Sequence, residues 1–474
     1  MTNLIVSDQK RLIIGMGQTG LSCARFLTSK GLSFDLCDTR EVLTNQSEIQ
    51  SEFSQCQLFN GELDGQLLAQ YQELIVSPGI AISEPAIVFA KEKGSRVRGD
   101  VDLFAEYVTK PVIGITGSNG KSTVTTLVGE ILTVAGHKPA VCGNIGIPVL
   151  DVLLRDDHYH CYVVELSSFQ LETTHHLAAE VACVLNLSED HMDRYDSMLA
   201  YHQAKHRIFQ GCRSVVHNRE DSLTQPLVSD AMPTKSFGLT MAENSVAAKN
   251  EYAIAQAELN GTCAQYLMFE QQPIFPISEL KIKGRHNQLN ALAAIALVDS
   301  LPEQFKVDKN QLQHVLSDFS GLPHRCTWVA EHEGIEYFND SKGTNVGSTL
   351  AAIEGLATAG QKKIILIAGG VGKDQDFEAL SDACQQSVKH VQLFGRDAAL
   401  IADSLTCEEN AVSVVDTLAH ALVQAKEIAE AGDVILFSPA CASFDQFANY
   451  VKRGEVFERL VTQIINGGVY DGEF

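Results

Sequence analysis

Short apolar runs alternate with longer stretches of helical periodicity along most of the chain. In the N-terminal half the runs predict strands at 12–15, 34–37, 74–76, 112–116, 162–166 and 182–186. A second series near the C-terminus predicts strands at 363–368, 391–394 and 434–437. Such alternation is typical of parallel sheets whose strands are joined by crossover helices. Between 218 and 279 the pattern turns polar and irregular, and we assign no function to that segment.

The length of the chain predicts several domains. It has 474 residues, and one hydrophobic core stops growing at roughly 250–300 residues. One strand-helix series ends near Gly99, and another change of pattern falls near Gly321. We therefore predict an α/β protein with domains at 1–99, 100–321 and 322–474, each with a mostly parallel sheet and crossover helices. The expected types are a Rossmann-like N-terminal domain, a P-loop central domain and a Rossmann-like C-terminal domain.

Composition and charge exclude several classes of function. A formal net charge of −23 disfavours attraction to nucleic acid or anionic lipid, so a phosphate ligand must be held by local groups. The 12 cysteines are scattered without a C-x-x-C pair, which is typical of reduced core residues and not of a zinc site or a disulfide framework. No apolar run approaches the ~18 residues of a membrane span. We expect a cytoplasmic protein with no nucleic-acid partner and no membrane span.

The strongest chemical signal is the glycine loop 116–122, Thr-Gly-Ser-Asn-Gly-Lys-Ser, between a predicted strand and a predicted helix. In this context backbone N–H groups surround phosphate oxygens, while Lys121, as an exposed loop cation, reaches the terminal phosphates and Ser122 offers a hydroxyl to Mg²⁺. The loop is a variant, because Ile115 stands where the general pattern has glycine. The alternative is a glycine-rich turn without a ligand, which the G-K-S ending disfavours.

A second glycine loop, 15–20, also lies between a strand and a helix, and Asp38 ends the next predicted strand. This satisfies the dinucleotide fingerprint, whose physical basis is a pyrophosphate at a helix N-terminus. The fingerprint alone is weak, because NAD, FAD and nucleotide sugars all carry a pyrophosphate.

Carboxylate and imidazole groups follow the next strands. Glu165 ends one predicted strand, from which it could reach Mg²⁺ beside the phosphate loop, although a solvated strand-end carboxylate is the alternative. The loop after the following strand carries Asp190, His191 and Asp193. Taken alone, His191 could equally be a structural, hydrogen-bonded histidine.

These motifs together resemble the Mur ligases, and among them the members that add D-glutamate. The matching stretches span nearly the whole chain: G-M-G-Q-T-G at 15–20, D-T-R at 38–40, S-P-G-I at 77–80, T-G-S-N-G-K-S at 116–122, G-N-I-G at 143–146, E-D-H-M-D-R-Y at 189–195, G-R-H-N at 284–287, G-L-P-H-R at 321–325, N-D-S-K at 339–342 and S-P-A-C-A-S at 438–443. Two departures are Tyr450, where the family usually has phenylalanine, and the poorly matching segment 218–279.

The resemblance implies a division of binding roles among the domains. It assigns the UDP-linked substrate to Gln18, Thr19, Gly20, Asp38, Thr39, Arg40, Gly79, Asn144 and His191. It assigns ATP to Gly117, Ser118, Asn119, Gly120, Lys121, Ser122, Thr123, Asn287, Asn290, His324, Arg325, Asp340 and Lys342. Helical spacing places Asn287 and Asn290 on one face. It assigns D-glutamate to Thr344, Lys373, Ser443 and Phe444, although Lys373 taken alone could be a surface turn lysine.

The resemblance also implies two Mg²⁺ sites, one at Ser122 and Glu165 and one at His191 and a carbamylated Lys205. Without the resemblance, Lys205 in the predicted helix 199–209 would be interpreted as a solvated surface lysine. The catalytic set is then Lys121, Glu165, His191 and Lys205.

The implied reaction is ATP-dependent addition of D-glutamate to UDP-N-acetylmuramoyl-L-alanine through an acyl phosphate, giving ADP and phosphate, by a protein expected to be a monomer. One alternative is another ATP-dependent amino-acid ligase of the superfamily, such as one acting on folate. An NAD-dependent oxidoreductase would explain residues 15–38 but leaves Lys121, Ser122 and Glu165 without a role.

Overall fold

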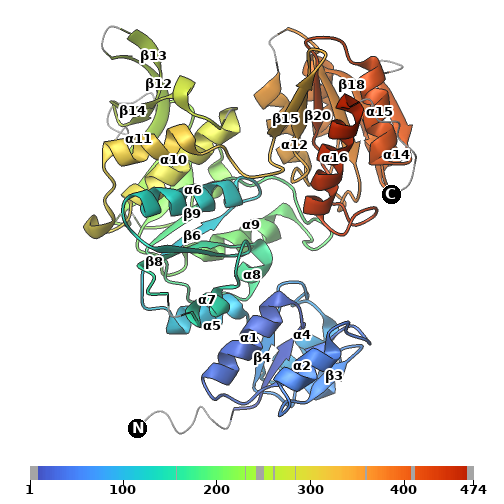
Figure 1. Cartoon of the computed structure of the whole chain (residues 1–474). Helices are drawn as coiled ribbons and strands as arrows, with labels where there is room; N and C mark the ends of the chain where they lie inside the picture. The colour runs from blue at the N-terminus through green and yellow to red at the C-terminus, as the bar shows by residue number, and fades with distance from the viewer. Residues whose placement is uncertain are drawn as a thin grey trace.

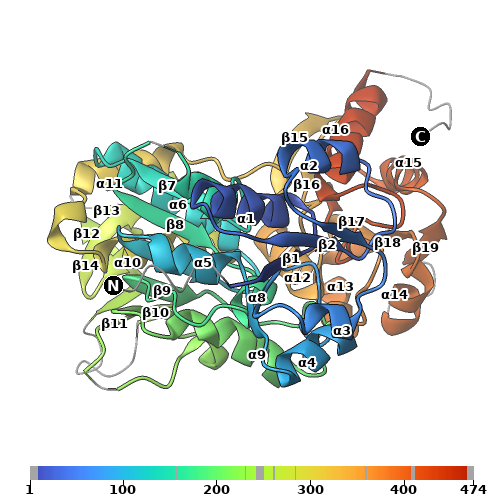
Figure 2. The ribbon, with the colours of Figure 1, turned by 90° about the horizontal axis from the view of Figure 1, so that it is seen from below.

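A computed structural model describes residues 9–155, 157–229, 231–241, 250–259, 262–282, 284–357, 360–406 and 411–466. Figure 1 shows three lobes, with the N-terminal lobe in blue, the central lobe in teal to yellow and the C-terminal lobe in orange to red. Each lobe is built on its own sheet, of five, nine and six strands respectively. Seen from below, the N-terminal lobe lies nearest the viewer (Figure 2).

The N-terminal sheet is fully parallel, in the order β3-β2-β1-β4-β5. Its elements are β1 (Arg11–Ile14), α1 (Gln18–Ser29), β2 (Asp35–Asp38), α2 (Gln46–Glu52), β3 (Leu58–Asn60), α3 (Gly65–Leu68), β4 (Glu73–Val76), α4 (Pro85–Glu92) and β5 (Arg96–Arg98). Side chains of a strand alternate between the two faces. Accordingly, Ile13 packs on one face of the sheet in a hydrophobic cluster with residues of α1. Leu12 and Ile14 pack on the other face with residues of α3 and α4.

The central sheet has the order β14-β13-β12-β11-β10-β9-β6-β8-β7. Its strands are β6 (Val112–Thr116), β7 (Pro139–Gly143), β8 (Cys161–Glu165), β9 (Val181–Val184), β10 (Val215–Asn218), β11 (Thr234–Phe237), β12 (Glu251–Leu259), β13 (Thr262–Phe269) and β14 (Gln272–Pro276). The α-helices are α5 (Asp100–Tyr107), α6 (Lys121–Val134), α7 (Val149–Leu153), α8 (Ser168–Glu172), α9 (Met198–His206), α10 (Arg285–Asp299) and α11 (Lys309–Asp318). Short 3-10 helices are η1 (Arg207–Phe209), η2 (Ser222–Thr224), η3 (Ile277–Glu279) and η4 (Glu303–Phe305).

The irregular segment 218–279 forms the far edge of the central sheet. It contributes β11 and the antiparallel strands β12, β13 and β14, which lie at the top left of Figure 1. Antiparallel strands with one solvated face need no crossover helix. The strand-helix alternation seen elsewhere therefore stops in this segment.

The C-terminal sheet has the order β15-β16-β20-β17-β18-β19, and only the β15–β16 pair is antiparallel. The strands are β15 (Thr327–His332), β16 (Ile335–Asn339), β17 (Ile364–Gly369), β18 (Val388–Phe394), β19 (Val412–Val415) and β20 (Val434–Phe437). The helices are α12 (Val346–Leu356), α13 (Ala379–Ser387), α14 (Ala398–Ser404), α15 (Leu418–Ile428) and α16 (Tyr450–Ile465).

The predicted fold class is confirmed: the protein is α/β, with three sheets that are mostly parallel. The domain boundaries at 99 and 321 stay predictions. Within the described residues, no helix combines the length and the apolar character needed to cross a bilayer. Because ligands of open α/β sheets bind outside the carboxyl ends of the strands, the loops after β1, β6, β8, β9 and β17 are where a site is expected.

Candidate active site

The phosphate loop, residues 116–122, connects β6 to α6 as the sequence predicts. The end of β9 holds it in place, because Asn186 accepts from the Ser118 N–H through its carbonyl oxygen at 2.9 Å and from the Asn119 N–H through Oδ1 at 2.8 Å. Gly120 has φ of 81°, and a Cβ there would lie 2.4 Å from Asn290 Oδ1. Glycine is therefore required at this position for both its conformation and its small size.

Lys121 does not project into solvent. Its Nζ donates to the carbonyl oxygens of Gly117 at 2.8 Å and Ser118 at 2.9 Å, and the side chain is partly buried. The prediction of an exposed loop cation was wrong, because the side chain folds back over its own loop. Burial lowers the pKa of Lys121, and Arg325 and Lys373 add to this against the attraction of Glu165 and Asp190.

Glu165 ends β8 beside the phosphate loop and is 1% exposed. Its Oε1 accepts from Asn144 Nδ2 at 2.7 Å, while its Oε2 is buried without a hydrogen-bond partner among the described residues. A buried, unsatisfied carboxylate oxygen is costly unless a ligand completes it. Mg²⁺, which prefers oxygen donors and is often held by one or two carboxylates plus phosphate oxygens, fits this position.

Ser122, the expected partner of Glu165 at the first metal, accepts from Arg325 Nη2 at 2.6 Å. In the described part of the chain, no three His, Cys, Asp or Glu side chains are arranged to hold a metal ion. Protein groups alone therefore do not form a complete cage here. The donor set matches a site that ligand phosphates and water must complete.

Lys205 lies on α9 and is 2% exposed, so the alternative of a solvated surface lysine is excluded. Its Nζ donates to the Gly117 carbonyl oxygen at 2.8 Å and lies 4.6 Å from the centre of the Tyr201 ring. Burial lowers the pKa of Lys205 well below its ordinary value, and the charge of Lys121 contributes to this. The amine therefore lies in an environment that disfavours its cationic form.

His191 lies on the loop after β9, with φ of 61°. Burial lowers its pKa to about 4; the cations Lys373, Lys121 and Lys205 act in the same direction, against Asp190. At neutral pH the imidazole is therefore uncharged, which is the form that can bind a metal. His191 and Lys205 both line a cavity of about 300 Å³ that also contains Lys121, Ser122 and Glu165. We call this space the reaction cavity.

The C-terminal lobe closes the reaction cavity from the other side. Thr344, Lys373, Ser443 and Phe444, the predicted D-glutamate residues, all line it. Lys373 forms an ion pair with Asp190 of the central lobe, and burial, which alone would raise the pKa of Asp190, is outweighed by Lys373, so that this pKa is about 2. Lys373 is therefore not a solvated turn lysine, and its side chain is only 10% exposed.

One residue at this junction, Asn345, was not identified from the sequence. Asn119 and Asn345 exchange side-chain amide hydrogen bonds of 3.2 and 3.1 Å, and Asn345 Nδ2 also donates to Asp190 at 3.2 Å. Asn345 caps α12 by accepting from the Ser348 N–H at 2.8 Å. A helix-capping asparagine gives no sequence signal for an inter-lobe contact, because its local role already explains it.

A second cavity, of about 530 Å³, extends from the phosphate loop along α10 to the β15–β16 pair. The predicted ATP residues Asn119, Gly120, Thr123, Asn287, Asn290, Arg325, Asp340 and Lys342 line it. Asn290 Nδ2 donates to Asn287 Oδ1 at 3.1 Å, which confirms that the two share a helix face. At the far end lie Phe338 and Trp328, which is 53% exposed and directly opposite Phe338 in the strand pair. We call this space the nucleotide cavity.

A third cavity, of about 440 Å³, lies at the glycine loop of the N-terminal lobe. Of the predicted UDP-substrate residues, it is lined by Gln18, Thr19, Asp38, Thr39, Arg40, Gly79 and Asn144. Asp38 Oδ2 accepts from the Met16 N–H at 2.6 Å, and Arg40 pairs with the same carboxylate. Although burial alone would raise it, these contacts hold the pKa of Asp38 below its usual value. We call this space the UDP cavity.

A few predicted residues do not line the cavity assigned to them. Gly20 instead lets α1 approach the glycine loop, since a Cβ there would lie 1.8 Å from the Gly15 carbonyl oxygen. His191 lines the reaction cavity and not the UDP cavity, whereas Asn144 lines both. Gly117 contributes its carbonyl oxygen to Lys121 and Lys205. His324 is buried against Asn339, with Nδ1 2.9 Å from Asn339 Nδ2.

Models of the Mur ligase families match three stretches of the chain: the Mur ligase MurD-like N-terminal domain at 9–99, the Mur ligase middle domain at 115–298 and the Mur ligase glutamate ligase domain at 324–441. A UDP-N-acetylmuramoylalanine--D-glutamate ligase from Pseudomonas savastanoi pv. phaseolicola is 48% identical over 97% of this chain and 99% of its own length. A protein of the same name from Pseudomonas aeruginosa is 48% identical over 98% of this chain and all of its own length.

Solved structures with the same fold are more distant in sequence. A UDP-N-acetylmuramate-alanine ligase from Thermotoga maritima aligns with a TM-score of 0.57 at 20% identity, covering 97% of this chain and 99% of that one. A MurF ligase from the same organism, in complex with ADP, aligns with a TM-score of 0.57 at 14% identity, covering 97% of this chain and 96% of that one.

Proposed function

This chain belongs to the Mur ligase family, and from that premise we propose that it joins D-glutamate to UDP-N-acetylmuramoyl-L-alanine at the expense of ATP. The relatives at 48% identity carry the name of this ligase over nearly the whole chain. The observation that carries the proposal is the reaction cavity, where the phosphate loop, Glu165 and His191 face Lys373 and Ser443 of the C-terminal lobe. A phosphate donor and an amino acid can therefore meet in one enclosed space.

The chemistry needs a carboxylate to become an electrophile. An oxygen of the L-alanyl carboxylate attacks the γ-phosphorus of ATP, the bond to ADP breaks, and an acyl phosphate forms. The amine of D-glutamate then attacks the acyl carbon, inorganic phosphate leaves, and the nitrogen loses a proton as the amide forms. Phosphoryl transfer depends mainly on positioning and charge neutralisation. We propose that Lys121 and N–H groups of the phosphate loop do that work when ATP is bound.

Mg²⁺ would neutralise phosphate charge when bound, and the donors present fit it. Glu165 Oε2 and Ser122 Oγ would hold a first ion, and the unsatisfied Glu165 Oε2 supports this assignment. For a second ion we propose His191 and a carbamylated Lys205. The neutral amine adds to CO₂ and releases one proton, which gives an anionic oxygen donor where the ammonium form would repel a metal ion. The burial of Lys205 supports this step, since it favours the neutral amine.

The three cavities suggest where each of the three substrates binds. The uridine nucleotide occupies the UDP cavity beside Asp38 and Arg40, and Asn144, which lines both spaces, lies where the muramoyl-alanine end enters the reaction cavity. ATP occupies the nucleotide cavity with its phosphates at the loop 116–122. D-glutamate occupies the side formed by Thr344, Lys373, Ser443 and Phe444. Enclosure protects the acyl phosphate from water.

We place the reaction in the cytoplasm, where ATP is available and thiols stay reduced; every described cysteine is free, which supports this. Because the described site is lined by residues of one chain, we propose that a monomer suffices. The rival ligase that acts on folate would not need the UDP cavity. An NAD-dependent oxidoreductase would leave the reaction cavity without a role.

The test is ADP release with UDP-N-acetylmuramoyl-L-alanine and a panel of D- and L-amino acids, with the amide product identified by mass spectrometry. We expect turnover with D-glutamate and at least about a hundredfold less with L-glutamate, because a reversed stereocentre misplaces one carboxylate. Turnover with folate and L-glutamate, or hydride transfer with NAD, would overturn the proposal.

A further inference from the structure

Arg194 joins the central lobe to the wall of the UDP cavity. It lies three residues after His191 on the same loop, and its side chain is 16% exposed. Its Nη2 donates to the Ile80 carbonyl oxygen at 3.2 Å, and its Nη1 donates to the Pro78 carbonyl oxygen at 3.5 Å. Both acceptors belong to the N-terminal lobe, more than a hundred residues away along the chain.

The acceptors form part of a binding surface. Residues 77–80 line the UDP cavity, and Ser77 Oγ donates to the Gly15 carbonyl oxygen at 2.8 Å. The loop that Arg194 contacts is therefore braced against the glycine loop 15–20. A shift of residues 78–80 would change the shape of the cavity on the side that faces the central lobe.

On its own side, Arg194 is held against α8 of the central lobe. Glu172 Oε2 accepts from Nη2 at 3.0 Å, and the guanidinium lies 4.5 Å from the centre of the Phe169 ring. The Phe169 ring lies 4.7 Å from the His191 ring and lines the reaction cavity. A continuous series of contacts thus runs from the wall of the UDP cavity through Arg194 and Phe169 to His191.

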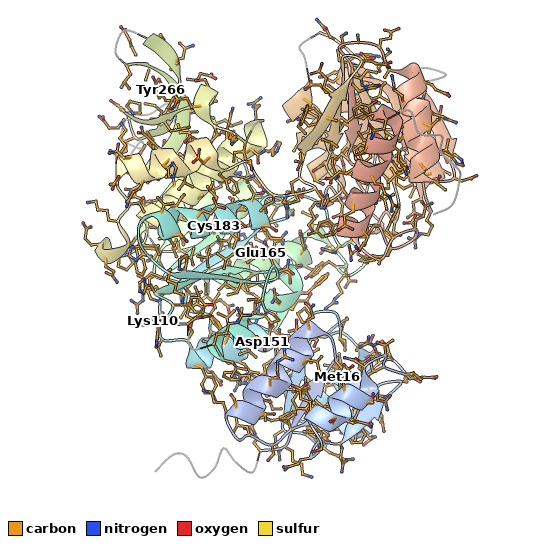
Figure 3. All side chains as sticks on the ribbon, viewed as in Figure 1. Met16, Lys110, Asp151, Glu165, Cys183 and Tyr266 are labelled. Carbon is orange, nitrogen blue, oxygen red and sulfur yellow. The ribbon has the colours of Figure 1, made fainter. Side chains whose placement is uncertain are left out.

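Arg194 is not what holds the two lobes together. They share an apolar core that contains Phe26 of α1 together with Val101 and Phe104 of α5, and Phe26 also contacts the partly exposed Tyr107 edge-on, with ring centres 4.9 Å apart. Arg25 of α1 also forms an ion pair with Asp151 of α7 at 2.6 Å. Figure 3 shows Asp151 at the junction of the two lobes, with Glu165 deeper in the central lobe.

We propose that Arg194 is a positioning residue: it keeps the UDP cavity aligned with the reaction cavity, so that the UDP-linked substrate reaches His191 in the correct position. This inference rests on the proposed function. A guanidinium presents planar, rigidly spaced donors, so it can satisfy two carbonyls and a carboxylate at once, which the single ammonium of lysine cannot do with the same geometry. The muramoyl-alanine end must cross from the UDP cavity to the reaction cavity, and Arg194 spans that same boundary.

The test compares Arg194→Ala with Arg25→Ala, which removes another arginine that joins the two lobes and lines none of the three cavities described above. We expect Arg194→Ala to raise the KM for UDP-N-acetylmuramoyl-L-alanine about tenfold or more, as for the loss of one charge-assisted hydrogen bond. The KM values for ATP and D-glutamate should change less than about twofold. Arg25→Ala should leave all three KM values unchanged. Arg194→Lys, which keeps the charge, should fall between wild type and Arg194→Ala.

The outcomes separate the two hypotheses. If the wild type makes no D-glutamyl product, the proposed function fails. If the wild type is active but Arg194→Ala matches Arg25→Ala, or raises all three KM values equally, the positioning role of Arg194 is overturned. If the melting curve shows that Arg194→Ala does not fold, Arg194→Lys is used in its place. An Arg194→Lys variant whose three KM values match those of Arg25→Ala, or are all raised equally, would overturn the positioning role.

Discussion

Lys121 and Lys205 donate to the same acceptor, the carbonyl oxygen of Gly117, each at 2.8 Å. One comes from the first residue of α6 and the other from α9. The acceptor is a neutral oxygen, so this contact does not neutralise either charge. The charge of Lys121 lowers the pKa of Lys205 only in part, because burial is the main cause. A site with this composition is stabilised by anions such as nucleotide phosphates and a carbamate.

Lys121→Ala should abolish most ADP release while the protein still folds. The Lys121 ammonium makes its hydrogen bonds within the phosphate loop, so its removal takes a positive charge from the transferring phosphoryl group and leaves the apolar core unchanged. We expect kcat to fall about a hundredfold or more. The control is Lys110→Ala, an exposed lysine marked in Figure 3. Near-normal turnover of Lys121→Ala would contradict the assignment of the phosphate loop.

Lys205→Arg should be nearly inactive, with kcat lower by about a hundredfold or more. Arginine keeps the positive charge but cannot form a carbamate, so the second metal would lose a donor. Removal of bicarbonate should weaken the wild type, and its return should restore activity. Full activity of Lys205→Arg, or indifference of the wild type to bicarbonate, would refute carbamylation. Lys306→Arg, on the surface, is the matched control.

Lys373→Ala should raise the KM for D-glutamate at least about tenfold and change that for ATP little. Lys373 pairs with Asp190, and we expect a carboxylate of D-glutamate to compete with Asp190 for this ammonium. Steady-state kinetics with each substrate varied in turn provides the measurement. An equal effect on both KM values would show that Lys373 lies outside the amino-acid pocket.

Asp100→Asn should stabilise the protein at neutral pH and not in acid. Burial raises the pKa of Asp100 to about 6, so the folded state holds this proton more tightly than the unfolded state. The stability that the protonated group contributes is complete below about pH 4 and is lost as the pH rises through about 6. The variant should therefore gain up to about 3 kcal/mol at pH 7.5.

The measurement for Asp100 is the difference in melting temperature between variant and wild type at several pH values. The difference should shrink as the pH falls from about 6 to about 4, because the wild-type carboxyl becomes neutral over that range. Asp403→Asn, at an exposed position on α14, should show no such trend. A constant difference at all pH values would mean that Asp100 is not buried as a carboxylic acid.

Nucleotide binding should change the fluorescence of Trp328, which is the single tryptophan of the chain. Its side chain lines the nucleotide cavity, and we expect the adenine base to lie against it. Stacking of a base on the indole should quench its emission, and Trp328→Ala should raise the KM for ATP roughly tenfold. Trp328→Phe should retain most of the affinity. Unchanged emission at saturating ATP would exclude contact with the base.

Local patterns determined much of this fold. The strand, loop and helix that become β6, the phosphate loop and α6 follow from an apolar run, two glycines and a helical stretch that lie together in 112–135. The same holds for β1, the glycine loop and α1. Each of these strand-loop-helix units depends only on residues that are close together in the sequence, so the spacing of hydrophobic residues is enough to locate its strand and its helix. The segment 218–279 was not predicted, because its antiparallel strands are specified by pairing with one another and less by alternation with helices.

The candidate site likewise combines features that the sequence indicates with contacts that only the tertiary structure shows. The sequence by itself indicated candidate residues for phosphate and for a first metal ion, because those motifs are short and continuous, while the candidates for D-glutamate came from the resemblance to the Mur ligases. Only the tertiary structure decided that Lys205 is buried beside Lys121, that Lys373 meets Asp190 and that Arg194 reaches Pro78 and Ile80. Each of these contacts joins residues far apart in the chain and depends on how whole lobes pack. No local pattern of polar and apolar residues specifies that packing.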